Sequence, residues 1–184
     1  MSQIDRIMIF IDGSNLFHSW RRVTKEFLDV AKMVDILKEG RNLIRAYYFH
    51  SECVPPKSEE TKFHDWLRYR GLEVITRPLK LRSSGIECKK CGNFFTRNIR
   101  VEKGVDVALV TNMLSFGFRN VYDTVILVSG DEDYIGAIEE LKHLGKKVEI
   151  AAFEGSISNN LRKKADKFVS LDKLTQSLTL KELT

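Results

Sequence analysis

A chain of 184 residues, of which 43% are hydrophobic and 30% charged, has the composition of one soluble globular domain that buries a core without disulfides. The 30 Lys and Arg residues outnumber the 25 Asp and Glu residues, which gives a formal net charge of +5. Three cysteines argue against a secreted disulfide framework, and the N-terminal apolar stretch is too short for a signal peptide or a membrane span. We therefore expect a single cytoplasmic domain over residues 1–184 with no membrane partner.

Apolar strands and amphipathic helices alternate along the chain. The patterns predict strands at residues 6–11, 43–50, 72–76, 121–129 and 147–153, and helices at 29–38, 58–70, 105–116, 134–144 and 158–165. The strands IMIFI and TVILV are apolar throughout, as expected of central strands with helices on both faces. The alternation predicts an α/β fold with a mostly parallel, doubly wound sheet.

Residues 78–103, PLKLRSSGIECKKCGNFFTRNIRVEK, interrupt this alternation. Turn residues, two cysteines and a strand-like end predict a β-hairpin, inserted before the helix at 105–116. Cys88-Lys-Lys-Cys91-Gly has the shape of a zinc knuckle, and structural zinc takes four ligands. Cys53 and His50 offer a second pair, so the four residues close a site if the hairpin folds back over that strand. The alternatives are a four-cysteine site shared by two hairpins across a homodimer, and two reduced thiols on a flexible loop.

Aspartates follow two of the apolar strands. Asp12 ends the first strand, and Asp131 and Asp133 follow the strand at 121–129. Ligands of an open parallel sheet bind at the carboxyl ends of the strands, where the strand order reverses, so these carboxylates converge if the two strands are neighbours. Asp106, in the first turn of the helix after the hairpin, is a fourth candidate. The alternative for Asp12 and Asp131 is helix capping, because Asp at a strand-to-helix turn often accepts hydrogen bonds from free N–H groups.

Carboxylates gathered in one crevice repel each other, and a divalent cation removes this conflict. Hard oxygen ligands suit Mg²⁺ or Mn²⁺. An acidic pocket within a basic surface would also attract a polyanion and deliver it to the bound cations. Charge alone favours nucleic acid only slightly.

Three motifs, FIDGSNLFHS, KGVDVALVTNM and VILVSGDEDYIGAIEELKHLGKKVEI, occur in this order, with SISNNLRKKADKFVSL after them. As a set they resemble the NYN domain family, in its LabA-like branch, within the PIN-like nuclease superfamily. The resemblance covers nearly the whole chain and implies a parallel sheet with an acidic metal site. The acidic positions of the family carry over to Asp12, Asp106, Asp131 and Asp133, with Asn15 as a polar companion of Asp12. The Cys-x-x-Cys hairpin departs from a plain family member.

The chemistry expected of such a site is metal-dependent hydrolysis of RNA. Two Mg²⁺ or Mn²⁺ ions about 4 Å apart activate the attacking water and stabilise the leaving oxygen of a phosphodiester. We predict Asp12 and Asp131 as primary metal ligands, Asp133 and Asp106 as residues that complete the site, and Asn15 as a residue that orients Asp12 or contacts a phosphate. Ser14 and Ser129 are candidates for hydrogen bonding in the crevice, and Glu132 is expected to face solvent.

Other functions are weighed on the same residues. The sequence contains no Gly-rich phosphate loop followed by Lys and Ser or Thr, and no G-x-G-x-x-G after the first strand. A haloacid-dehalogenase-type phosphatase needs a second aspartate where Ser14 stands, and a receiver domain needs paired acids where only Asp12 is found. The alternative from another class is a non-catalytic RNA-binding or regulatory module.

Basic and aromatic side chains flank the predicted site. Bases of single-stranded RNA stack on aromatic rings while Lys and Arg hold the phosphates. We predict that RNA is bound by Arg77, Lys80, Arg82, Arg97, Arg100, Lys103 and His18. Phe94 and Phe95 either contribute to this surface or pack inward within the hairpin.

Overall fold

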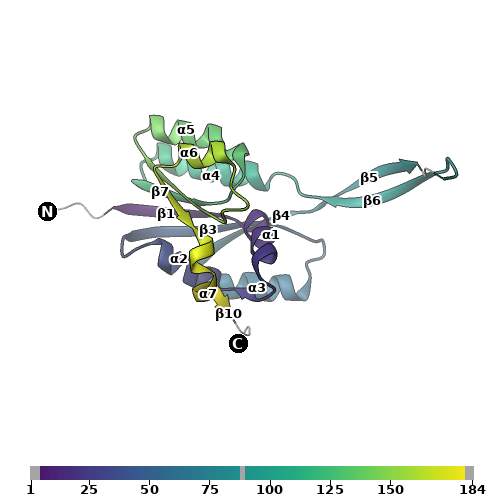
Figure 1. The fold of residues 1–184 in the computed structure, drawn as a ribbon, viewed down its shortest axis with the longest axis horizontal. Coiled ribbons are helices and arrows are strands. Elements are labelled where there is room, and N and C mark those ends of the chain that lie inside the picture. Colours follow the sequence, from purple (N-terminus) through teal and green to yellow (C-terminus); the bar gives the residue numbers. More distant parts are fainter. Residues whose placement is uncertain (1–4, 88–89, 181–184) are drawn as a thin grey trace.

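The computed structural model describes residues 5–87 and 90–180. At its centre is a six-stranded parallel sheet with the order β4-β3-β1-β7-β8-β9 (Figure 1). Its strands are β1 (Arg6–Asp12), β3 (Asn42–Glu52), β4 (Leu72–Pro78), β7 (Thr124–Val128), β8 (Lys147–Ala152) and β9 (Lys167–Ser170). The chain adds β3 and β4 on one side of β1, then returns to β7 on the other side. The strand order therefore reverses between β1 and β7, and this confirms the predicted doubly wound sheet.

Helices cover both faces of the sheet (Figure 1). One face carries α1 (Gly13–Val23), α2 (Val30–Leu37), α3 (Ser58–Tyr69) and α7 (Thr175–Leu178), and the other carries α4 (Val105–Phe118), α5 (Ile135–His143) and α6 (Asn159–Lys164). Successive side chains of a strand point to opposite faces. In β1, Ile7 and Ile9 face the first group of helices and Met8 and Phe10 the second. The strand is apolar throughout because both of its faces are buried.

Short elements complete the fold. They are the 3-10 helices η1 (Glu132–Tyr134) and η2 (Leu171–Leu174), and a small antiparallel sheet of β2 (Phe27–Leu28) and β10 (Thr179–Leu180). In the part of the chain that the structure covers, no helix has the length and apolar character needed to cross a membrane.

The interruption at 78–103 is a hairpin, as predicted. Strand β5 (Lys80–Glu87) pairs antiparallel with β6 (Phe94–Val101), from Lys80 opposite Val101 at the base to Glu87 opposite Phe94 at the far end. The hairpin extends away from the rest of the molecule (Figure 1) and leads into α4. We refer to β5 and β6 as the arm.

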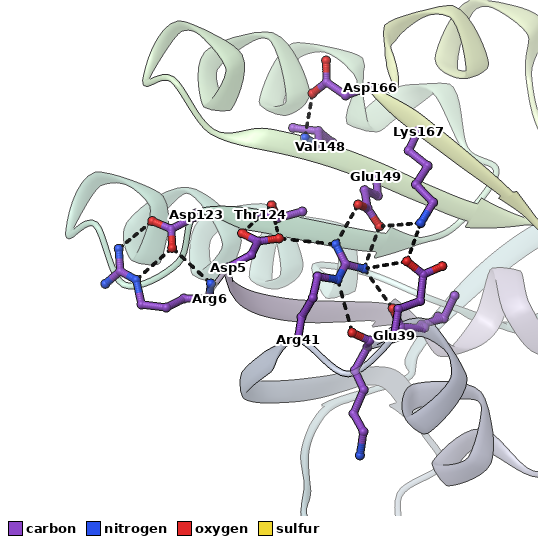
Figure 2. A network of polar contacts seen from close by, with 12 residues as sticks. Asp5, Arg6, Glu39, Arg41, Asp123, Thr124, Val148, Glu149, Asp166 and Lys167 are labelled. Atoms are coloured by element: carbon purple, nitrogen blue, oxygen red, sulfur yellow. Dashed lines mark hydrogen bonds and ion pairs between the residues drawn. The ribbon is translucent and has the colours of Figure 1, made fainter. Parts of the chain in front are cut away.

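The amino ends of the strands are joined by ion pairs (Figure 2). The guanidinium of Arg41 binds the buried carboxylate of Glu149 in a bidentate manner, at 2.7 and 3.0 Å. Its Nη1 also lies 3.5 Å from Asp5, which accepts a hydrogen bond of 2.9 Å from the hydroxyl of Thr124. These contacts link the loop before β3 with β7 and β8. They hold the two halves of the sheet together at the end opposite the carboxyl ends of the strands.

Candidate active site at the carboxyl ends of β1 and β7

Asp12 lies at the point where the strand order reverses. It is the last residue of β1 and the N-cap of α1, and it is 4% exposed. Its Oδ1 accepts a hydrogen bond of 3.0 Å from the N–H of Asn15, and its Oδ2 accepts from the hydroxyls of Ser129 at 3.2 Å and Tyr134 at 3.0 Å. Burial raises the pKa of Asp12, and the charge of Asp106 adds to this rise, while the three hydrogen bonds oppose it. Asp12 thus caps α1 with one carboxylate oxygen and directs the other to the hydroxyls of Ser129 and Tyr134.

The hydroxyl of Tyr134 lies between two carboxylates. It is 3.0 Å from Oδ2 of Asp12 and 3.1 Å from Oδ1 of Asp106, which is in the first turn of α4. Burial, together with both carboxylates, raises the pKa of Tyr134 far above its ordinary range, so the hydroxyl remains neutral and donates. One hydroxyl carries one proton and donates fully to only one acceptor at a time. The two carboxylates share this donor. Asp12 also accepts from Ser129, and Asp106 is exposed, so water or a cation can occupy its remaining acceptor positions.

Asp131 and Asp133 lie in the turn that follows β7. Asp131 is the N-cap of η1, and its Oδ1 accepts a hydrogen bond of 3.1 Å from the N–H of Asp133. Asp133 is exposed. Glu132 is also exposed, as expected, and accepts a hydrogen bond from the hydroxyl of Ser158. The first N–H groups of this turn have no backbone acceptor, and the carboxylate of Asp131 accepts a hydrogen bond from one of them.

The structure therefore brings together two of the four predicted aspartates. Asp12 and Asp106 meet at Tyr134, while Asp131 and Asp133 stay at their own turn. Within residues 5–87 and 90–180, no three His, Cys, Asp or Glu side chains are grouped closely enough to hold a metal ion. Of the four carboxylates expected to converge, the structure thus groups Asp12 with Asp106, and Asp131 accepts a hydrogen bond within its own turn.

Asn15 joins the two loops at this end of the sheet. Its side-chain oxygen accepts a hydrogen bond of 3.1 Å from the N–H of Gly130. A side chain at Gly130 would not fit, since an added Cβ would lie 2.2 Å from the carbonyl oxygen of Ser156. An open pocket of about 570 Å³ adjoins these loops and has the size of a small-ligand site. It is lined by Asn15, His18, Ser19, Arg22, Gly130, Asp131, Glu132, Gly155, Ser156, Ile157 and Ser158.

A second polar cluster adjoins Asp12 through the first turn of α1. The hydroxyl of Ser14 donates to the carboxylate of Glu102 at 2.6 Å and lies 3.4 Å from Nδ1 of His50. Burial lowers the pKa of His50, against the opposing charge of Glu102, so the imidazole favours its neutral form. Glu102 follows the last residue of the arm. Glu102 and Tyr134 are not among the predicted site residues, although Glu102 directly precedes the motif KGVDVALVTNM and Tyr134 lies within the motif that contains Asp131 and Asp133.

Of the four residues proposed to bind zinc, the three that the structure describes are not brought together within one chain. Cys53 is buried, and its Sγ lies 3.4 Å from Nη1 of Arg100 at the base of the arm. Cys91 is exposed in the turn at the far end. Strands of eight residues place that end roughly 25 Å from the base. Cys53 and His50 are therefore out of reach of Cys91, and Cys88 lies outside the described residues.

The predicted RNA-binding residues lie in two places. Arg77, Lys80, Arg82, Arg100 and Lys103 are exposed along the arm and its base, and His18 lines the pocket. The side chains of Arg97 and Phe95 lie outside the described residues. Phe94 is 76% exposed, so the alternative in which it packs inward is wrong.

Comparisons with known proteins agree with this architecture. The model of the NYN domain family matches residues 6–172. "Low amplitude and bright protein LabA" of Synechococcus elongatus is 28% identical over 170 residues, which cover 91% of this chain and 84% of the relative. The uncharacterised protein y4oD of Sinorhizobium fredii is 34% identical over 77 residues, 40% of this chain and 36% of that protein. A crystal structure of a Vibrio parahaemolyticus protein of unknown function has a TM-score of 0.74 at 22% identity, covering 98% of this chain and 99% of that one, and supports the fold.

Proposed function

Because this chain belongs to the NYN domain family, we propose that it is a metal-dependent endoribonuclease whose chemistry takes place at Asp12 and Asp106. The observation that carries the proposal is the position of Tyr134, whose hydroxyl lies 3.0 and 3.1 Å from the two carboxylates. The pair shares this one hydroxyl and stands where the strand order reverses, and Asn15, whose N–H binds Asp12, lines the adjoining open pocket. Such a site is suited to a cation and an anionic substrate.

The donor set fits Mg²⁺ or Mn²⁺. Mg²⁺ is usually held by one or two carboxylates, with water and substrate phosphates in the remaining positions, so a third protein ligand is not required. Asp12 and Asp106 would hold the ion, and Asp131 and Asp133 would contact it through water. When bound, the ion would make the phosphodiester more electrophilic and lower the pKa of a bound water.

The surrounding residues of the chain have separate roles. Tyr134 fixes the orientation of both carboxylates, and Asn15 fixes the spacing between the turn after β1 and the turn after β7. His18 and Arg22 line the pocket and would bind phosphates that flank the cleaved bond. His50, neutral and 3.4 Å from Ser14, would accept a proton near the site.

A non-catalytic RNA-binding module is the second candidate. Its support is that both oxygens of Asp12 already accept hydrogen bonds and that Asp131 caps its own turn. In such a module Tyr134 and the carboxylates would stabilise the fold, and the arm and the pocket would bind RNA without cutting it.

Cleavage by charge-neutral variants separates the two candidates. Asp12→Asn and Asp106→Asn should each lower the rate of Mn²⁺-dependent RNA cleavage by about 100-fold or more, because each removes a charge at the reacting centre. The matched control is Asp35→Asn, an exposed residue of α2, which should cut at the wild-type rate. Circular dichroism checks that each variant is folded. Unchanged cleavage by a folded double variant of Asp12 and Asp106 would exclude the proposed site.

A further inference from the structure

The positive charge of the chain is concentrated in the arm and its base. Residues 77–103 contain eight Lys or Arg and two Glu, which gives this segment a net charge of +6. Since the whole chain has a formal net charge of +5, the remaining residues together have a net charge of −1. The main body is thus nearly neutral, and any electrostatic attraction for a polyanion comes mainly from one hairpin.

The arm exposes charged and apolar side chains to solvent. It extends from the main body as a two-stranded ribbon (Figure 1), and a two-stranded hairpin is at best marginally stable in water on its own. Lys80 and Arg82 are exposed, and neither forms an ion pair with any residue that the structure describes. Leu81 and Phe94 are 70% and 76% exposed. Unpaired cations near the base of the arm and an exposed aromatic ring at its far end are side chains of the kinds that bind single-stranded nucleic acid.

The base of the arm is attached to the rim of the acidic site. Glu102, one residue beyond β6, accepts the 2.6 Å hydrogen bond from Ser14, which is two residues after Asp12. After a short turn, α4 begins and carries Asp106 to Tyr134. The arm therefore joins the main body beside the helix that carries Asp106.

We propose that the arm binds the same RNA strand that enters the acidic site, so that the preferred substrate is single-stranded RNA long enough to reach from Asp12 to Phe94. The inference rests on the proposed function for its cleavage site, but the binding it requires is independent of cleavage. The arm, roughly 25 Å long, adds phosphate and base contacts that a dinucleotide cannot make. Short fragments would contact only the site at Asp12 and Asp106, so they would dissociate faster than a long strand.

The first test measures binding of the full-length Asp12→Asn protein to a long unstructured RNA at several salt concentrations. Replacing Lys80 and Arg82 with Gln should make the slope of log K against log salt shallower by about 1.4, as expected for two lost phosphate contacts on a single strand. The matched control replaces Lys32 and Lys173, which are exposed and lie in α2 and η2, and should keep the wild-type slope. Equal slopes for the two double variants would overturn the inference.

The second test examines the far end. Phe94→Ala should weaken binding of the long RNA by at least about fivefold and leave binding of a dinucleotide unchanged, because stacking reaches only the longer strand. Phe118→Ala is the control, since Phe118 is 64% exposed at the opposite end of α4. If Phe94→Ala changes the oligomeric state in sedimentation but not RNA binding, the arm is an assembly surface and the inference is wrong.

The two proposals fail separately. Arm-dependent binding without cleavage by the wild type would uphold the arm and reject the nuclease. Cleavage of long RNA and dinucleotide at equal rates, with no effect of the arm variants, would uphold the nuclease and reject the arm.

Discussion

Asp12 and Asp131 both cap a turn, but the two capping interactions leave their carboxylates in different positions. Asp12 uses one oxygen for the N–H of Asn15, and its second oxygen points to Tyr134. Asp131 directs its carboxylate to the N–H of Asp133, within a three-residue 3-10 turn. Each capping residue uses one oxygen for a backbone N–H, but only Asp12 also shares the hydroxyl of Tyr134 with a second carboxylate, that of Asp106. We expect Asp12 to contribute more to cation affinity than Asp131.

His64 makes the folded protein sensitive to acid. Its side chain is buried, and burial, with the neighbouring His50, lowers its pKa below the ordinary value of 6.5, against the opposing charge of Glu52. The folded state therefore binds a proton less readily than the unfolded state, and stability is lost as the pH falls below about 6.5. The melting temperature should fall between about pH 7 and pH 5, and it should fall less in His64→Gln.

The control for this measurement is His143→Gln, which changes an exposed imidazole and should keep the wild-type pH dependence. The comparison uses the slope with pH, so an overall loss of stability in His64→Gln does not affect the outcome. A parallel decline in all three proteins would show that His64 is not responsible.

At the scale of elements, the predicted strands and helices correspond to observed ones, and the main omission is α1. The sequence GSNLFHSWRRV contains Ser, Asn, His and Trp, which are weak helix formers, so local preference does not indicate a helix. Tertiary packing decides instead, because Leu16 and Trp20, four residues apart, are both buried against the sheet. Capping by Asp12 then starts the helix. Strand β9 is also absent from the predicted strands, because its four residues are only partly buried or exposed and show no apolar pattern.

The length of the arm also restricts which residues can bind one zinc ion together. Because Cys53 and His50 lie near its base and Cys91 at its far end, a second chain must supply the other two ligands if Cys88 and Cys91 bind structural zinc. Elemental analysis of protein purified without added metal should then find about 0.5 zinc per chain, in a dimer that Cys88→Ser with Cys91→Ser converts to monomer. One zinc per chain in a monomer, or no zinc with both thiols freely reactive, would contradict this arrangement.

At the scale of the whole molecule, the sequence was sufficient to predict a mostly parallel, doubly wound sheet, but neither the order of its strands nor the composition of the site. Apolar runs followed by aspartate at residues 12 and 131 predict two central strands whose carboxylates converge if the strands are neighbours, and the pairing of β1 with β7 meets this condition. The partnership of Asp12 with Asp106 through Tyr134 depends on how α4 and η1 pack on the same face, which no local pattern encodes. The contact of Glu102 with Ser14 likewise depends on where the arm rejoins the main body.

The central claim, that this molecule uses its acidic pair to cut RNA by attack of water, is tested most directly by the ends of the products. The wild-type protein is incubated with a long labelled RNA, with and without Mn²⁺, and the new termini are identified by mass spectrometry. We predict cleavage only with Mn²⁺ or Mg²⁺, and 5′-phosphate and 3′-hydroxyl ends, because a carboxylate-held cation favours water as the nucleophile and the 3′-oxygen as the leaving group. Products with 2′,3′-cyclic phosphate, formed without added metal, would contradict the account and point to acid–base chemistry at a histidine such as His50 or His18.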